Sequence, residues 1–234
     1  MALDLYVGCF SRYHARQWEN LAQQYARETG SEYRIITPDG GPPQAANWDE
    51  VTEAVGHWRA RMNAALGAHL RSPLDWRESR DTPYFTHRPG YDAYGALLLW
   101  AAYTEVGKSP PERYSGEWFS DPVYKECSTP KPGQKSRALL CGALWLPADF
   151  EFGFQAQNLT GDQVEIRSNR SLLDALKWLN DSTFRLSPDQ LRQAACDNYE
   201  DDAPLSDLAR FGLAVFHEMA EKSVEHHLPI LLDS

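Results

Sequence analysis

Three side chains near the carboxyl end of the chain have the types and spacing of metal ligands. His217, Glu221 and Glu225 follow one another at intervals of four residues, so on a helix they share one face. The His-Glu-x-x-His motif of zinc proteases is absent, because Glu221 stands where its second histidine would be. The alternative is a solvated face whose histidines suit the negative end of a helix dipole. We favour that alternative and expect neither a metal ion nor another cofactor.

A second set of side chains has the types used in acid–base chemistry. His87, Asp81 and Asp92 lie close together in the sequence, in the region 71–92. Arginines in the same loop, Arg77, Arg80 and Arg88, suit an anionic ligand, but such residues more often pair with neighbouring carboxylates. No nucleophile elbow, phosphate-binding loop or dinucleotide-binding glycine pattern is present. The sequence therefore leans against an enzyme, and a small-molecule enzyme with a His/Asp site in this region is the alternative.

Negative charge is concentrated in the last fifth of the chain. Residues 186–234 contain ten Asp and Glu against three Lys and Arg, which gives a formal charge of −7. The densest part is the segment DNYEDD, with the candidate docking residues Asp197, Tyr199, Glu200, Asp201 and Asp202. Such a segment is either a solubilising loop or a surface on which carboxylates attract a basic partner and an aromatic ring supplies contact.

The whole-chain composition points in the same direction. The 234 residues carry a formal net charge of −10, which disfavours nucleic acids and anionic membranes and favours a basic protein partner. The four cysteines form no Cys-x-x-Cys pair, so a structural zinc site is not expected. The amino-terminal residues MALDLYVG show no basic segment followed by a long apolar one, which predicts a cytoplasmic protein.

The elements that must position these residues are organised around one apolar stretch. Tyr91 to Val106 is predicted to be a helix buried on all sides, too short to span a bilayer. A helix from Trp48 to about Leu70, with Asn47 as its N-cap, has an apolar stripe that we expect to dock on this central helix. The stripe consists of Val51, Val55, Trp58, Met62 and Leu66.

The remaining pattern mixes strands and helices. Other helices are expected over Ser11–Thr29, from a cap at Asn169 or Ser171 to Leu179, from Pro188 onward, and over Leu205–His227. Strands are expected at Leu3–Phe10, Glu32–Thr37, Ala138–Leu146, in a hairpin of Phe150–Gln157 with Val164–Ser168, and in the terminal LPILLDS as a strand or an anchored tail. This order predicts one α+β domain over residues 1–234, with a small mixed sheet packed against several helices, or an α/β fold if the first two strands pair in parallel.

Two long irregular stretches, 71–90 and 107–136, are rich in aromatic residues. Loops of this length in a compact domain are often functional. The alternative is that their aromatic side chains fasten the loops to the core.

An acidic single-domain chain that begins with LDLYVG and ends with an apolar helix and LPILLDS resembles bacterial immunity proteins of toxin systems. The resemblance implies a protein that neutralises a cognate toxin domain by covering its active site or its substrate path. Under this hypothesis the acidic segment, or the aromatic loops, would contact a basic cleft of the toxin.

Overall fold

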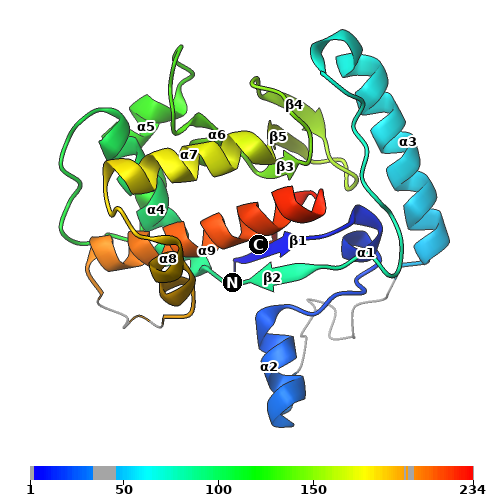
Figure 1. Cartoon of the computed structure of the whole chain (residues 1–234), viewed down its shortest axis with the longest axis horizontal. Helices are drawn as coiled ribbons and strands as arrows, with labels where there is room; N and C mark the ends of the chain where they lie inside the picture. Colours follow the sequence, from blue (N-terminus) through cyan, green and yellow to red (C-terminus); the bar gives the residue numbers. More distant parts are fainter. Residues whose placement is uncertain (1–2, 34–45, 198, 200–202, 234) are drawn as a thin grey trace.

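The computed structural model describes residues 3–33, 46–197, 199 and 203–233 (Figure 1). Its sheet has the strand order β2-β1-β6-β3-β5-β4, in which only β3 and β5 pair in parallel and the other neighbours pair antiparallel. The strands are β1 (Asp4–Val7), β2 (Phe85–His87), β3 (Leu144–Leu146), β4 (Phe154–Gln157), β5 (Gln163–Ser168) and β6 (Ile230–Asp233). The mixed sheet confirms the predicted α+β fold.

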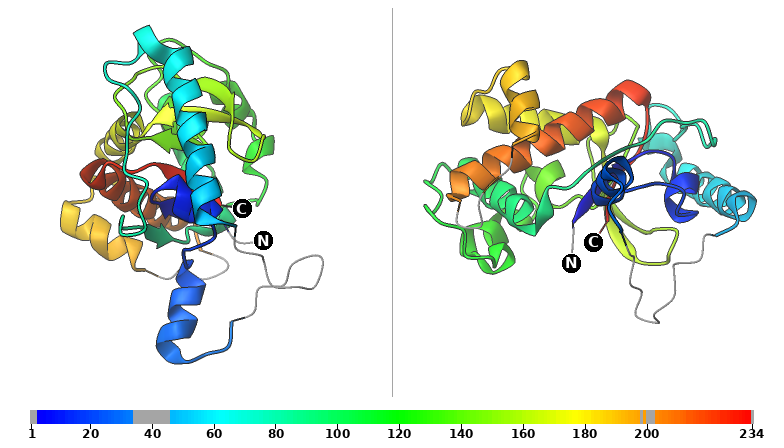
Figure 2. Two further views of the ribbon diagram at one scale, coloured as in Figure 1. Left: turned by 90° about the vertical axis from the view of Figure 1, so that its right-hand side faces the viewer. Right: turned by 90° about the horizontal axis from the view of Figure 1, so that it is seen from below.

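Helices cover both faces of this sheet (Figures 1 and 2). The helices are α1 (Phe10–His14), α2 (Leu21–Thr29), α3 (Trp48–Leu66), α4 (Gly90–Glu105), α5 (Pro122–Ser128), α6 (Arg137–Leu140), α7 (Asn169–Ser182), α8 (Pro188–Ala195) and α9 (Leu205–His226), with short 3₁₀ turns at Gly67–His69 and Trp118–Ser120. In β3, Trp145 points into the larger core with α4, α7 and α9, whereas Leu144 and Leu146 point into a second core with α1 and α3. The sheet therefore separates two hydrophobic cores.

The apolar stretch that was expected to be central forms α4, within one residue of its predicted ends. Its Ala93, Leu97, Leu98 and Ala101 are fully buried in the larger core. α9 packs directly on α4, and a Cβ built on Gly212 would lie 2.5 Å from the carbonyl oxygen of Ala93. Glycine at this position lets the two helix backbones approach closely.

The apolar end of the chain forms an internal strand. β6 pairs with β1 on one side and with β3 on the other, so it joins the two halves of the sheet. The preceding helix α9 ends at His226, and the next residue, His227, caps it with a left-handed backbone. Both predicted elements, the terminal helix and the terminal strand, are confirmed.

The predicted docking of the helix that begins at Trp48 is wrong. α3 forms as expected, with Asn47 accepting a hydrogen bond from the backbone of Asp49. Its stripe, however, packs in the second core against β3, β5 and Phe150, on the other side of the sheet from α4. Spacing shows which residues share a helix face, but it does not show which apolar surface that face meets.

Two further elements differ from their predicted form. The expected helix Ser11–Thr29 is split into α1 and α2, because Arg16 adopts a left-handed backbone and Asn20 with Gln23 forms a new capping box. The expected strand Ala138–Leu146 begins as the short helix α6 and is extended only over β3. Short apolar runs are ambiguous between helix and strand, which explains the second error.

The remaining differences from the predicted elements concern the residues at which they begin or end. Ser168, rather than Asn169 or Ser171, caps α7, and Ser187 with Gln190 caps α8, which begins at Pro188 as predicted. Of the predicted strand Glu32–Thr37, residues 34–37 lie outside the described residues. Within the described part of the chain, no helix is both long enough and apolar enough to cross a bilayer.

Candidate functional site

His87 lies on the edge strand β2, and both of its ring nitrogens are engaged by backbone groups. Nδ1 accepts a hydrogen bond from the backbone nitrogen of Arg88 at 2.9 Å, so in the neutral ring the proton is on Nε2, which donates to the carbonyl oxygen of Ala195 at 3.1 Å. Burial lowers the pKa of His87, although Glu218 opposes this shift. A neutral imidazole with both nitrogens engaged ties β2 to the end of α8.

The structure does not join His87 to the carboxylates predicted to act with it. Asp81 is exposed and accepts hydrogen bonds from Ser79 and Arg77 in its own turn. Asp92 is exposed in the first turn of α4, where a negative charge suits the helix dipole. No hydrogen bond or ion pair connects any two of His87, Asp81 and Asp92.

The three candidate metal ligands on α9 also fail to converge. His217 is 7% exposed, and its Nδ1 lies 3.6 Å from an Oε2 oxygen of Glu221. Burial lowers the pKa of His217, and the nearby Glu221 partly offsets this effect. Glu225 is exposed one turn further on. Among the described residues, no group of three or more His, Cys, Asp and Glu has a geometry that could hold a metal ion.

The acidic segment is described only in part. Asp197 lies 4.0 Å from Arg210 in a half-exposed ion pair, and Tyr199 is 37% exposed. The Tyr199 hydroxyl donates to the carbonyl oxygen of Pro89, and its ring packs on Phe211. Tyr199 thus contacts both the residue that precedes α4 and a residue of α9. Glu200, Asp201 and Asp202 lie outside the described residues.

Other carboxylates of the acidic region lie on α8 and α9. Asp189 is exposed in the first turn of α8, and Glu221 and Glu225 are exposed on α9. Asp207, Glu218 and Glu225 recur at intervals that place them on one side of α9, and α8 packs across the same helix. We call the carboxylates of Asp189, Asp207, Glu218, Glu221 and Glu225 the acidic surface. Asp233 is separate from it, because β6 carries Asp233 into the sheet, where it accepts a hydrogen bond from Tyr13.

The stretches 71–90 and 107–136 are not irregular throughout, since the first contains β2 and the second contains α5. Their aromatic residues mainly fasten both stretches to the core. Trp76 is 3% exposed in the second core, and Trp118 packs against Tyr94 and Tyr124 over α4. A Cβ on Gly95 would collide with Trp118, so this glycine makes room for the loop. Phe119 is the exception, with 56% of its surface exposed.

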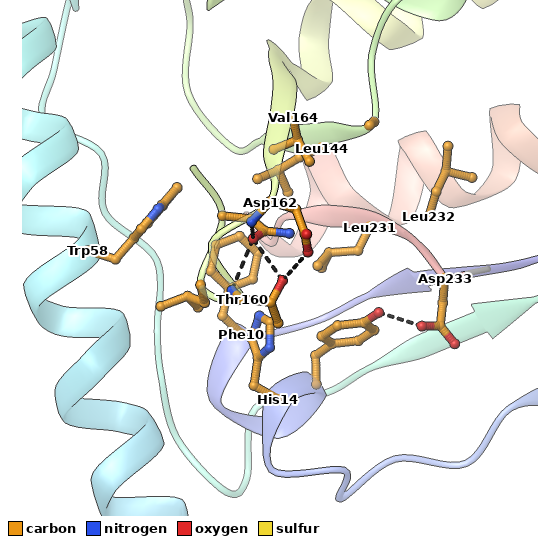
Figure 3. A pocket seen from close by; sticks show the side chains of 14 residues that line it. Phe10, His14, Trp58, Leu144, Thr160, Asp162, Val164, Leu231, Leu232 and Asp233 are labelled. Atoms are coloured by element: carbon orange, nitrogen blue, oxygen red, sulfur yellow. Dashed lines mark hydrogen bonds between the residues drawn. The ribbon is translucent and has the colours of Figure 1, made fainter. Parts of the chain in front are cut away.

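A cavity that sequence reasoning did not identify lies on the α1–α3 side of the sheet (Figure 3). It has a volume of about 280 Å³, and its walls come from α1, α3, β3, the β4–β5 hairpin and β6. In Figure 3, Trp58 and Asp233 lie on opposite sides, with His14 and Thr160 between them. The lining consists of Phe10, Tyr13, His14, Trp58, Ala143, Leu144, Asn158, Leu159, Thr160, Asp162, Val164, Leu231, Leu232 and Asp233.

The polar groups of this cavity are held by local hydrogen bonds. Asn158 Oδ1 accepts from the backbone nitrogens of Thr160 and Asp162, which fixes the hairpin turn. The hydroxyl of Thr160 donates to Asp162, and the hydroxyl of Tyr13 donates to Asp233. Burial and the neighbouring Asp233 raise the pKa of Tyr13, so it remains a donor. Burial lowers the pKa of His14 to about 4, so His14 is neutral at pH 7.

The fold and these sites define an α+β protein with an acidic helical surface and a small polar–aromatic cavity. Comparison with protein-family models, with curated protein sequences and with solved structures found no match to this chain.

Proposed function

We propose that this protein is a cytoplasmic bacterial immunity protein, which binds a basic toxin domain and neutralises it. The observation that carries the proposal is the uneven charge distribution: residues 186–234 hold a formal −7 of the chain's −10. The apolar sides of α8 and α9 are buried in the core, and of the acidic surface Glu218 is half-buried while the other four carboxylates are exposed. A concentrated negative surface attracts a basic partner and speeds its association.

The described ion pairs leave part of this charge available to a partner. Arg192 pairs with Asp189, and Arg210 lies near Asp197. Among the described contacts, Asp207, Glu218 and Glu225 form no ion pair with Lys or Arg. Their carboxylates are spread along α9, which rises about 1.5 Å per residue, so they can follow an elongated basic cleft.

The competing proposal, a small-molecule enzyme using His87, Asp81 and Asp92, gains little support. Both nitrogens of His87 are engaged by backbone groups, and neither carboxylate contacts it. A general base needs a free acceptor within reach of its substrate. We therefore retain the binding function.

Co-expression tests the proposal directly. The candidate toxin is a basic carboxyl-terminal domain of a large secreted protein encoded beside this gene. Bacteria that produce this domain are expected to grow only when they also produce the present chain. The combined variant Asp207→Asn, Glu218→Gln and Glu225→Gln should lose most of this protection.

A matched control removes the same amount of charge elsewhere. Glu28, Glu53 and Glu117 are exposed and lie outside the acidic surface, so their combined change to Gln should leave protection intact. Equal protection by the two triple variants would contradict a role for the acidic surface. No protection by the unaltered chain against any toxic neighbour would contradict the function itself.

A further inference from the structure

The cavity of Figure 3 combines negative charge with aromatic walls. Its lining contains two carboxylates, Asp162 and Asp233, and no Lys or Arg. One oxygen of each carboxylate accepts the hydrogen bond from Thr160 or Tyr13, while no described residue donates to the other oxygen. The second oxygens, Asp162 Oδ1 and Asp233 Oδ2, are therefore available to a ligand that donates hydrogen bonds.

Aromatic rings and aliphatic side chains form the apolar part of the cavity wall. Phe10 and Trp58 pack edge to face with their centroids 5.6 Å apart, and Leu144, Val164 and Leu231 complete the apolar wall. Such a wall favours contact with an apolar or aromatic group of a ligand. His14 is neutral at pH 7 and adds no positive charge that would oppose a cation.

We propose that this cavity binds a small organic cation, an amine that carries a compact apolar or aromatic group. The ammonium group would donate to Asp162 and Asp233, and the apolar group would lie against Phe10, Trp58 and Leu231. An anion would meet two carboxylates with no Lys or Arg in the lining to offset the repulsion. Pockets for drug-sized ligands begin at about 300 Å³, so this cavity suits a molecule at the small end of that range.

The hairpin and α1 give the site a defined shape. Trp58 Nε1 donates to the carbonyl oxygen of Gln157 at 2.7 Å, which holds α3 against β4. Glu78 accepts from the backbone nitrogens of Phe10 and Ser11 at 3.0 and 2.8 Å and so fixes the start of α1. A preformed site loses less conformational entropy on binding.

Three probes of nearly equal size separate charge from shape. Titration calorimetry, with ligand-observed NMR for weak binding, would compare 2-phenylethylamine, 2-phenylethanol and phenylacetate. The amine should bind with a Kd on the order of 1 mM, as expected for a ligand of about nine heavy atoms. Its affinity should exceed that of the alcohol about 10-fold, and phenylacetate should bind most weakly.

Variants of the two carboxylates test whether the amine binds in this cavity. Asp162→Asn and Asp233→Asn retain acceptors for Thr160 and Tyr13, so they change charge with little change in shape. Each should weaken amine binding about 3-fold to 10-fold, and the double variant should bind the amine no better than the alcohol. Asp174→Asn, on α7, removes the same charge outside the cavity and outside the acidic surface, and it should leave the Kd unchanged.

Three results would overturn the proposal: no saturable amine binding up to 10-fold above the expected Kd, equal affinity for amine and alcohol, or unchanged amine affinity in the double variant. The cavity and the acidic surface share no residue, so the proposal does not depend on the immunity function. If the amine did not bind, the proposal of toxin binding would still stand. If the protein gave no protection against a toxin, the proposal of amine binding would still stand.

Discussion

At the scale of single residues, burial decides which of the charged groups matter for stability. Asp4 is 3% exposed, and its two carboxylate oxygens accept from Arg88 Nε at 2.7 Å and Nη2 at 3.1 Å. This contact raises the pKa of Arg88. The expected pairing with carboxylates holds for Arg77 and Arg88 among the described contacts, whereas Arg80 contacts Gln17 and the ring of Trp48. Nothing in the local sequence pattern distinguished the buried Arg88–Asp4 pair from the exposed Arg77–Asp81 pair.

Removing Arg88 should therefore destabilise the folded protein strongly. Arg88→Ala leaves a buried carboxylate without its partner and should lower the free energy of unfolding by about 3–5 kcal/mol. Arg71→Ala breaks an exposed pair with Asp149 and should cost less than about 1 kcal/mol. Urea unfolding followed by circular dichroism measures both values. Equal losses in the two variants would show that the Arg88 pair contributes no more than a surface contact.

His14 should make stability depend on pH. Its pKa is about 4 in the folded protein and about 6.5 when unfolded, so above pH 6.5 it is neutral in both states. As the pH falls below 6.5, the unfolded chain takes up a proton that the folded protein does not, and the free energy of unfolding decreases until about pH 4. Between pH 7 and pH 5 the loss from this residue should be about 1–2 kcal/mol.

A His14→Gln variant provides the comparison for this pH effect. Its free energy of unfolding should decrease less between pH 7 and pH 5 than that of the unaltered protein. An NMR titration of the His14 ring gives the folded pKa directly. A value near 6.5 would contradict the burial of this imidazole beside Phe10 and Tyr13.

At the scale of elements, the sequence was most informative where a long run had one clear character. α4 and α9 were predicted closely because they are apolar over several turns, and β6 followed from the apolar end of the chain. It was less predictable which helices and strands pack against one another. α3 presents a clear stripe, yet its contact with β3 and β5 depends on a sheet assembled from strands far apart in the chain.

The contact between α4 and α9 gives a sharp test of this packing. In Gly212→Ala the new Cβ would lie 2.5 Å from the carbonyl oxygen of Ala93, so the helices must separate. We expect a loss of about 1–3 kcal/mol in the free energy of unfolding. The same change at Gly56, on the exposed side of α3 with no atom within 4 Å, should stabilise by about 0.5–1 kcal/mol. Stabilisation by both changes would contradict the close approach of α4 and α9.

At the scale of the whole molecule, charge could be predicted from the sequence, but the cavity could not. A count of Asp and Glu is enough to locate the acidic region, although Glu200, Asp201 and Asp202 lie outside the described residues. The cavity combines residues from positions 10–14, 58, 143–164 and 231–233. These segments are far apart in the sequence, so no residue spacing predicts that they meet. They come together only in the folded sheet, where β6 lies beside β3.

The most direct test of the central claim is the association rate of the basic neighbouring toxin domain with this protein, measured by stopped-flow fluorescence at increasing salt. We predict that the rate constant falls about 10-fold or more between 50 and 500 mM NaCl, since salt screens long-range attraction. The Asp207, Glu218 and Glu225 variant should associate more slowly at low salt, while the Glu28, Glu53 and Glu117 variant should not. A rate constant that is independent of salt and equal in both variants would contradict recognition through the acidic surface.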